Sequence, residues 1–360
     1  MIICSPQYGL KPNSNAGGEV YDEMVLKGLA DFGNQIEIIL PYGKSYDKNQ
    51  KNWNVYNLGI PYIHFSYLFN FAILPKLYKI YKKTKFKILR VHSPYFVGIG
   101  ALLFKKFFAK DIKIVTTYFH FEPFFLFNVI DKLLIKKWDH IITISEATRN
   151  DLINKYDISP EKITLAYCGI SKKYKKSDSV NKSDKKQITF CGILIKRKNV
   201  DFIIDIASKI GTKDAVFNII GDGPEMDNLK AYAKEKNAYD KFVFWGYLSE
   251  DKKIEILQAS DIFLFPSFME GFGLAPVEAM ACGVPTLVSD RGSLPEVVGD
   301  GGLILPLDED KWIDSIVRIL SDKELSKELS KKAVEKSAKY NWEEVVGKIN
   351  SAMTKINNEN

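Results

Sequence analysis

Short apolar runs alternate with helix-compatible segments along the second half of the chain, and this alternation is the strongest constraint on its fold. The predicted strands are Ile188–Cys191, Val216–Ile220, Phe242–Trp245, Ile262–Phe265, Thr286–Ser289 and Leu303–Leu305. Strands that alternate with helices pair in parallel, because each crossover helix returns the chain to the same end of the sheet. The pattern therefore predicts an α/β fold with a doubly wound parallel sheet, whose ligands bind at the carboxyl ends of the strands.

The first half of the chain begins with the same alternation. We expect strands at Met1–Cys4 and Ile36–Leu40 on either side of a helix at Glu19–Phe32, and later strands at Ile88–Val91 and Ile112–Thr116. A strand, a helix and a second strand in this order form a βαβ unit. The first half is therefore also predicted to build a parallel sheet.

The length and one polar segment indicate where the domains divide. A chain of 360 residues corresponds to about two domains of ordinary size. The segment Ser171–Lys186 is rich in lysine and poor in apolar residues, as expected of a linker. We therefore predict a first domain at residues 1–170, a second at residues 171–340 and a separate final helix at residues 341–360.

The composition is typical of a globular protein in a reducing compartment. Apolar residues make up 46% of the chain and charged residues 26%, and no apolar run approaches the ~20 residues that span a bilayer. The N-terminus lacks the basic and long apolar regions of a signal peptide. The four cysteines are scattered and the four histidines form no cluster. We therefore expect a cytoplasmic protein with free thiols and no metal site.

The net charge of +7 is unevenly distributed. Residues 1–170 hold 22 Lys/Arg and 14 Asp/Glu, so the whole positive excess lies in the first half. Aromatic residues are interleaved with these lysines, as in Phe104-Lys105-Lys106-Phe107-Phe108. This pattern suits an anionic membrane surface, although core aromatics beside solvated lysines remain the alternative. No nucleic-acid-binding motif is present, so we expect no nucleic acid partner.

The stretch Ser267–Pro295 carries the most chemical information. Gly271 and Gly273 lie in a loop between a predicted buried strand and a following helix. In this arrangement backbone N–H groups and a helix N-terminus converge on one point. This arrangement suits a phosphate. Glu270 and Glu278 flank the loop, and eight helical residues correspond to roughly 12 Å, whereas paired glycosidase carboxylates lie about 5–9.5 Å apart. Separate roles are therefore favoured for the two carboxylates.

This stretch contains the motif Glu-Gly-Phe-Gly-Leu at residues 270–274, Glu278 eight residues after Glu270, and Ala-Met-Ala-Cys-Gly-Val-Pro at residues 279–285. These three features resemble the donor-site signature of retaining glycosyltransferases of family four. The strand and helix of residues 139–148 are a second match. The resemblance implies the GT-B fold, with two Rossmann-like domains facing a cleft and the final helix crossing back to the first domain. It also implies transfer of a sugar from a nucleotide-sugar donor to a hydroxyl acceptor, with the anomeric configuration retained.

The same resemblance implies roles for individual residues. Glu270 and His120 are the expected catalytic residues, with Glu270 at the sugar. The expected donor-binding residues are Gly18, Arg197, Lys198, Leu248, Phe272, Gly273, Leu274 and Glu278, of which Glu278 binds the ribose hydroxyls. The family has an arginine where this chain has Ile193, so Arg197 or Lys196 is expected to substitute for it. His92 is a weaker candidate for the role of His120.

The expected cofactor and partners follow from these roles. The resemblance implies a hexosyltransferase that needs no obligatory metal, and Asp308-Glu309-Asp310 is interpreted as favourable charge at a helix start. The aromatic, basic first half favours a glycan or lipid-linked glycan of the cell envelope as acceptor, and peripheral attachment at the inner face of the membrane. Two alternatives stay open: a nucleotide-sugar isomerase or epimerase of the same fold, and a non-enzymatic binder of membrane surfaces.

Overall fold

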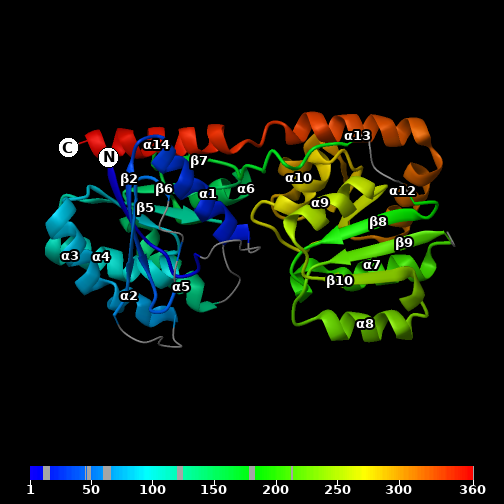
Figure 1. Cartoon of the computed structure of the whole chain (residues 1–360), viewed down its shortest axis with the longest axis horizontal. Coiled ribbons are helices and arrows are strands. Elements are labelled where there is room, and N and C mark those ends of the chain that lie inside the picture. The colour runs from blue at the N-terminus through cyan, green and yellow to red at the C-terminus, as the bar shows by residue number, and fades with distance from the viewer. Residues whose placement is uncertain are drawn as a thin grey trace. The chain divides into compact units, whose positions relative to one another are not determined.

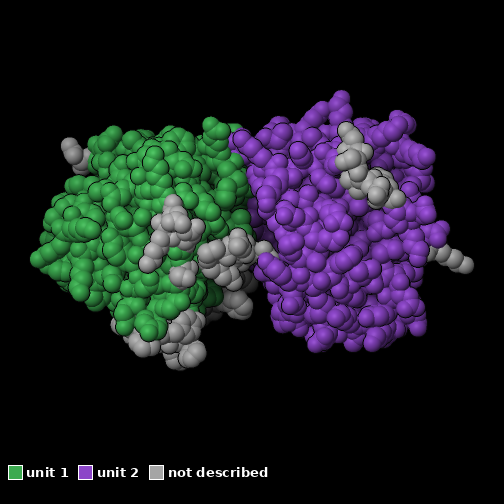
Figure 2. Space-filling view, in the orientation of Figure 1, with its two compact units in different colours: residues 1–169, 342–360 green, residues 170–341 purple. Residues whose placement is uncertain are grey.

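The computed structural model describes residues 1–10, 17–44, 46, 50–59, 66–119, 125–177, 183–211 and 214–359. They form two compact units, which Figure 2 shows in different colours. Unit 1 comprises Met1–Gly169 together with Trp342–Asn360, and unit 2 comprises Ile170–Asn341. The chain therefore leaves unit 1 once, completes unit 2, and returns to unit 1 for its last helix (Figure 1).

Unit 1 is built on a seven-stranded sheet in the order β3-β2-β1-β4-β5-β6-β7, and every pairing is parallel. The strands are β1 (Ile2–Pro6), β2 (Gln35–Leu40), β3 (Trp53–Asn57), β4 (Ile88–Val91), β5 (Lys113–Tyr118), β6 (His140–Thr143) and β7 (Ile163–Leu165). The order reverses between β1 and β4, which pair through Ile3 and Ile88. Such a reversal is the switch point of a doubly wound sheet.

Helices cover the sheet of unit 1 (Figure 1). They are α1 (Gly17–Asp31), α2 (Phe69–Ala72), α3 (Leu74–Thr84), α4 (Ile99–Phe108), α5 (Phe125–Leu134), α6 (Glu146–Tyr156) and α14 (Trp342–Asn358). The last helix packs on α1 at Gly28, where a Cβ atom would lie 2.6 Å from Val346 Cγ2. A glycine is therefore needed for the close approach of these two helices. Ser145 caps α6 by accepting a hydrogen bond from the Thr148 N–H at 3.2 Å.

Unit 2 is built on a six-stranded sheet in the order β10-β9-β8-β11-β12-β13, again with only parallel pairings. The strands are β8 (Lys186–Cys191), β9 (Ala215–Ile220), β10 (Phe242–Gly246), β11 (Ile262–Phe265), β12 (Thr286–Ser289) and β13 (Leu303–Leu305). The helices are α7 (Val200–Lys209), α8 (Met226–Glu235), α9 (Glu250–Ala259), α10 (Leu274–Ala281), α11 (Leu294–Val298), α12 (Glu309–Ser321) and α13 (Lys323–Ser337). The predicted doubly wound parallel sheet is confirmed in both units.

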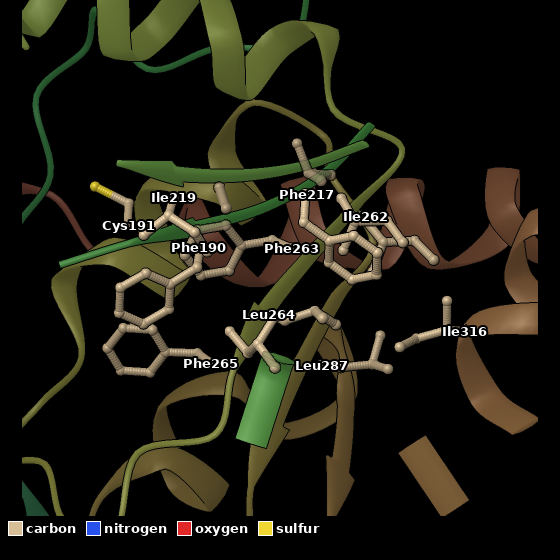
Figure 3. Close-up of a cluster of buried hydrophobic side chains, with 14 of the residues drawn as sticks. Phe190, Cys191, Phe217, Ile219, Ile262, Phe263, Leu264, Phe265, Leu287 and Ile316 are labelled. Carbon is tan, nitrogen blue, oxygen red and sulfur yellow. The ribbon is translucent and has the colours of Figure 1, made fainter. Parts of the chain in front are cut away.

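The core of unit 2 explains why its strands are continuous apolar runs. Along β11, the side chains of Phe263 and Phe265 point to one face of the sheet, and the side chain of Leu264 points to the other. Phe265 stacks on Phe190 with ring centroids 5.6 Å apart, while Leu264 pairs in register with Leu287 (Figure 3). Helices cover both faces, so all four positions of β11 are buried.

The two strands that the sequence did not predict, β3 and β7, are the outer strands of the unit 1 sheet. In β3 only Trp53 is buried, and the other four positions are half-buried or exposed. Edge strands need apolar side chains at fewer positions, so their sequences carry a weaker signal. Among the described residues, no helix is long and apolar enough to cross a membrane.

Candidate active site

The glycine-rich loop after β11 places Glu270 beside two cations at the switch point of the unit 2 sheet. Lys198 Nζ lies 2.6 Å from Glu270 Oε1, and Arg197 Nη1 lies 3.5 Å from the same oxygen. The Ser267 hydroxyl also donates to this oxygen at 2.6 Å. Glu270 is only 9% exposed, so these contacts hold a largely buried carboxylate in one position. The structure thus brings together Glu270, Arg197 and Lys198, which are three of the predicted site residues.

Lys198 is the more buried of the two cations. Its side chain is 12% exposed, and Nζ lies 4.8 Å from the centroid of the Phe265 ring. Burial lowers the pKa of Lys198, although the negative charge of Glu270 opposes that shift. An ammonium group that has lost most of its water interacts strongly with an incoming anion, because little hydration has to be removed.

Arg197 ties the loop after β8 to the loop after β11. Its guanidinium group donates to the Met269 carbonyl, and its own carbonyl accepts from the Phe268 N–H at 2.9 Å and from the Ser267 hydroxyl at 3.0 Å. These hydrogen bonds hold the loop after β8 and the loop after β11 together. Ile193, where the resemblance called for an arginine, is 46% exposed.

Two glycines allow the loop to fold closely around Glu270. Gly292 has φ of +58°, and a Cβ atom there would lie 2.8 Å from both N and O of Glu270. Gly273 has φ of +97° and precedes α10 as its N-cap. Phe272 is 3% exposed and packs its ring on Tyr340. Its side chain therefore anchors the loop, and only its backbone is suited to a ligand.

Glu278 lies on α10 and has a different set of partners from Glu270. Lys253 Nζ lies 3.0 Å from Glu278 Oε2 and 3.1 Å from Oε1. The Tyr174 hydroxyl borders the same carboxylate: burial raises the pKa of Tyr174, and the negative charge of Glu278 raises it further. Because the two glutamates are held by separate groups, they are suited to separate roles, as the spacing indicated.

Sequence reasoning missed Lys253. A signal for it exists, since Lys253 lies three and four residues before Ile256 and Leu257, which are both buried. On a helix these positions share one face. A lysine on the apolar face of an amphipathic helix needs a partner, whereas the neighbouring Lys252 points to solvent and pairs with the exposed Glu255.

The remaining positions of the predicted donor site lie at neighbouring strand ends. Leu248 follows β10 and packs against the unit 2 core, while Tyr247 before it is 63% exposed. After β9, Gly221 has φ of +132°, and a Cβ atom there would meet the Gly192 carbonyl oxygen at 1.9 Å. The turns after β8 and β9 therefore pack directly on one another. Leu274 is the first residue of α10.

The predicted residues of unit 1 are only partly described. Gly18 lies in the first turn of α1, and His120 lies outside the described residues. His92 follows β4 and contacts the buried carboxylate of Asp22, which also accepts a hydrogen bond from Arg90. Burial lowers the pKa of His92 to about 4, so its ring is neutral at physiological pH.

No group of three or more potential metal ligands is found in the part of the chain that the structure describes. In particular, Asp308 is the N-cap of α12 and accepts a hydrogen bond from the Lys311 N–H at 3.2 Å. This cap explains the acidic triplet at residues 308–310, as expected from its position at a helix start.

Comparison with known proteins identifies relatives along almost the whole chain. A family model described as Glycosyl transferases group 1 matches residues 171–336, and one described as Glycosyltransferase Family 4 matches residues 16–173. An N-acetyl-alpha-D-glucosaminyl L-malate synthase from Bacillus anthracis is 28% identical over 357 residues, covering 93% of this chain and 90% of that protein. A UDP-Gal:alpha-D-GlcNAc-diphosphoundecaprenol alpha-1,3-galactosyltransferase from Escherichia coli is 29% identical over 284 residues, covering 70% of this chain and 71% of that protein.

A solved structure shares the fold at lower sequence identity. Anabaena Alr3699/HepE in complex with UDP and glucose has a TM-score of 0.82 and 17% identity, covering 99% of this chain and 100% of that chain. The two family models overlap at residues 171–173 and together extend from residue 16 to residue 336, and both are described as glycosyltransferase families. The chain therefore belongs to the group 1 glycosyltransferases of family four and has their GT-B fold.

Proposed function

We propose that this glycosyltransferase is a retaining hexosyltransferase that uses a nucleotide-sugar donor. The observation that carries the proposal is the cluster of Glu270, Lys198 and Ser267 in front of the N-terminus of α10. A carboxylate suits sugar hydroxyls, while a desolvated ammonium group and a helix N-terminus suit the diphosphate of the donor. In support, one solved structure with this fold is a complex with UDP and glucose.

In the proposed reaction, the bond between the anomeric carbon and the diphosphate breaks, and its electron pair leaves with the diphosphate. Lys198, Arg197 and the backbone N–H groups of residues 272–274 stabilise the charge that develops on the leaving group. The acceptor oxygen forms the new bond on the same face of the sugar, and its proton passes to the departing diphosphate. Glu270 orients the sugar and Glu278 holds the ribose. Since cations and a helix N-terminus serve the diphosphate, we propose that no metal is obligatory.

We further propose a glycan or lipid-linked glycan of the cell envelope as acceptor, with the protein acting in the cytoplasm at the membrane. In support, one relative is named for a diphosphoundecaprenol-linked acceptor. Unit 1 also presents exposed aromatic rings beside lysines, since Phe107 and Phe108 are 64% and 49% exposed at the end of α4. The roles of Gly18 and His120 stay predictions.

The proposal is tested by incubating the purified protein with a panel of nucleotide sugars, with and without candidate acceptors, and measuring nucleotide release and the anomeric configuration of the product. The variant Glu270→Ala is expected to lower turnover at least about a hundredfold, because it lacks the carboxylate at the reacting sugar. Nucleotide binding should be retained. An inverted product would contradict retention, and release of an epimerised donor would favour the isomerase instead.

A further inference from the structure

Lys253 and Glu278 form an ion pair that connects α9 to α10, next to the predicted ribose site. The Lys253 side chain is 22% exposed and that of Glu278 is 15% exposed. One ammonium group lies within 3.1 Å of both carboxylate oxygens. The ring of Tyr174 covers the ammonium group on another side, at 5.0 Å from Nζ to the ring centroid. Both ends of this ion pair are therefore fixed by packing as well as by charge.

The surroundings of Lys253 keep its ammonium group charged. Burial alone would lower the pKa of Lys253, but the charge and hydrogen bond of Glu278, together with smaller effects of Cys191 and Glu250, make the net shift upward. Lys253 therefore stays charged. Lys253 thus presents a fixed positive charge to both carboxylate oxygens of Glu278.

The geometry leaves room for a second function of the same carboxylate. An ionised carboxylate has about four lone-pair sites, two on each oxygen. Lys253 contacts both oxygens from one side and so uses about one site on each. The Tyr174 hydroxyl forms a hydrogen bond with the same carboxylate and uses a third site. The remaining site suits one hydroxyl group of a ribose.

We propose that Lys253 is a positioning residue that makes the nucleotide site selective for ribose, by holding Glu278 oriented so that its remaining acceptor site faces a ribose hydroxyl. The inference rests on the proposed function, because it takes Glu278 as the ribose-binding group. The inference goes further than the proposed function because it gives Lys253 an indirect role. Lys253 contacts no substrate itself, but it makes the site distinguish ribose from other sugars of the nucleotide.

The test compares the binding of UDP, GDP and ADP with that of their 2′,3′-dideoxy analogues by titration calorimetry. The variant Lys253→Met is expected to lower the preference for the ribonucleotide about tenfold, which is the loss of about 1.4 kcal/mol of selective binding. The reason is that Glu278 loses the contact that orients its carboxylate. Binding of the dideoxynucleotide should change by less than about twofold, because the diphosphate site is untouched.

Lys252→Met is the matched control. Lys252 is the next residue on the same helix, and it pairs with Glu255 at 2.7 Å, with exposed fractions of 41% and 66%. Exposed pairs contribute little, so this variant should keep the ribonucleotide preference. An equal loss in both lysine variants would overturn the inference, because the effect would then arise from the charge of the helix.

Two further variants separate the possible outcomes. Lys253→Arg keeps the cation and should keep most of the preference, and Lys253→Gln tests the loss of charge with a polar side chain of similar size if the methionine variant does not fold. A Lys253 variant that weakens both nucleotides equally would contradict a positioning role. Glu278→Ala should abolish the preference; if it does not, the assignment of Glu278 in the proposed function is wrong. If Glu278→Ala abolishes it and Lys253→Met leaves it intact, only the inference about Lys253 fails.

Discussion

Asp22 and Arg90 form a buried ion pair in unit 1, with side chains that are 1% and 0% exposed. Burial is the main cause that lowers the pKa of Arg90 to about 10, so the guanidinium group remains charged at neutral pH. Asp22 is its counter-ion and also contacts His92. A charge that is almost fully removed from water needs such a partner, because its desolvation costs several kcal/mol.

Loss of this counter-ion should be strongly destabilising. Asp22→Asn leaves Arg90 as an uncompensated buried charge, and we expect the free energy of unfolding to fall by about 3–5 kcal/mol in urea titrations. The double variant Asp22→Asn with Arg90→Met removes both charges and should recover part of this loss. If the double variant is less stable than the unaltered protein by the full sum of the two single effects, the pair contributes no coupling energy and the argument fails.

At the residue scale, the sequence carries its strongest signal where the candidate residues belong to one local motif. Glu270, Gly273 and Glu278 belong to one short segment, and the strand before it was predicted with the bounds that β11 has. Lys253 is 25 residues from Glu278 in sequence, and only the packing of α9 against α10 brings the two together. Burial distinguishes Lys253 from Lys252, and one sequence alone expresses that difference only weakly.

At the scale of elements, the loop after β11 depends on backbone conformations that L-residues rarely adopt. Gly292 combines a φ of +58° with close contact to the Glu270 backbone. The Ser293 hydroxyl donates to the Glu270 carbonyl at 3.0 Å, which brings the start of α11 against the same residue. The position of the catalytic candidate therefore depends on a turn that lies about twenty residues later in the chain.

Gly292→Ala should lower turnover strongly and lower the free energy of unfolding only modestly. The left-handed conformation costs an L-residue about 1–2 kcal/mol, and the added methyl group must displace the Glu270 backbone. A displacement of about 1 Å can reduce turnover a hundredfold. The control is Gly43→Ala, with φ of +73° and no atom within 4 Å of the added Cβ, which should carry the strain cost without loss of activity. Turnover and thermal unfolding of both variants check this, and equal turnover in the two would argue against the positioning of Glu270 by this turn.

At the scale of the whole molecule, the parallel sheets followed from the sequence because buried central strands are continuous apolar runs. The weaker signals came from positions where burial is partial. Trp53–Asn57 at one sheet edge is mostly half-buried or exposed and was not predicted. The aromatic, basic character of the first half has a mixed basis: Phe104 is buried in the core, while Phe107 is exposed. Composition could not separate these two cases, since the periodicity of α4 decides which rings face outward.

The outward-facing rings and lysines define one surface of unit 1. It comprises Tyr78, Lys79, Lys82 and Lys83 of α3 and Lys106, Phe107 and Phe108 of α4. Tyr78 and Phe108 join the two helices, with ring centroids 5.3 Å apart, and Lys82 lies over the Tyr78 ring. Aromatic rings that insert at the headgroup level, next to cations that attract anionic lipids, are typical of peripheral membrane binding.

This aromatic–lysine surface should bind anionic vesicles. In co-sedimentation with phosphatidylglycerol-containing vesicles at low salt, the double variant Phe107→Ser with Phe108→Ser is expected to reduce the bound fraction several-fold, because burial of apolar area supplies part of the affinity. Phe32→Ser is the control, since Phe32 is 50% exposed but follows α1. Raising the salt concentration should weaken binding of the unaltered protein, as each lysine near the membrane contributes about 1 kcal/mol through screened attraction. If the unaltered protein stays in the supernatant at low salt, the membrane proposal is wrong, while the assignment of the donor site in unit 2 is unaffected.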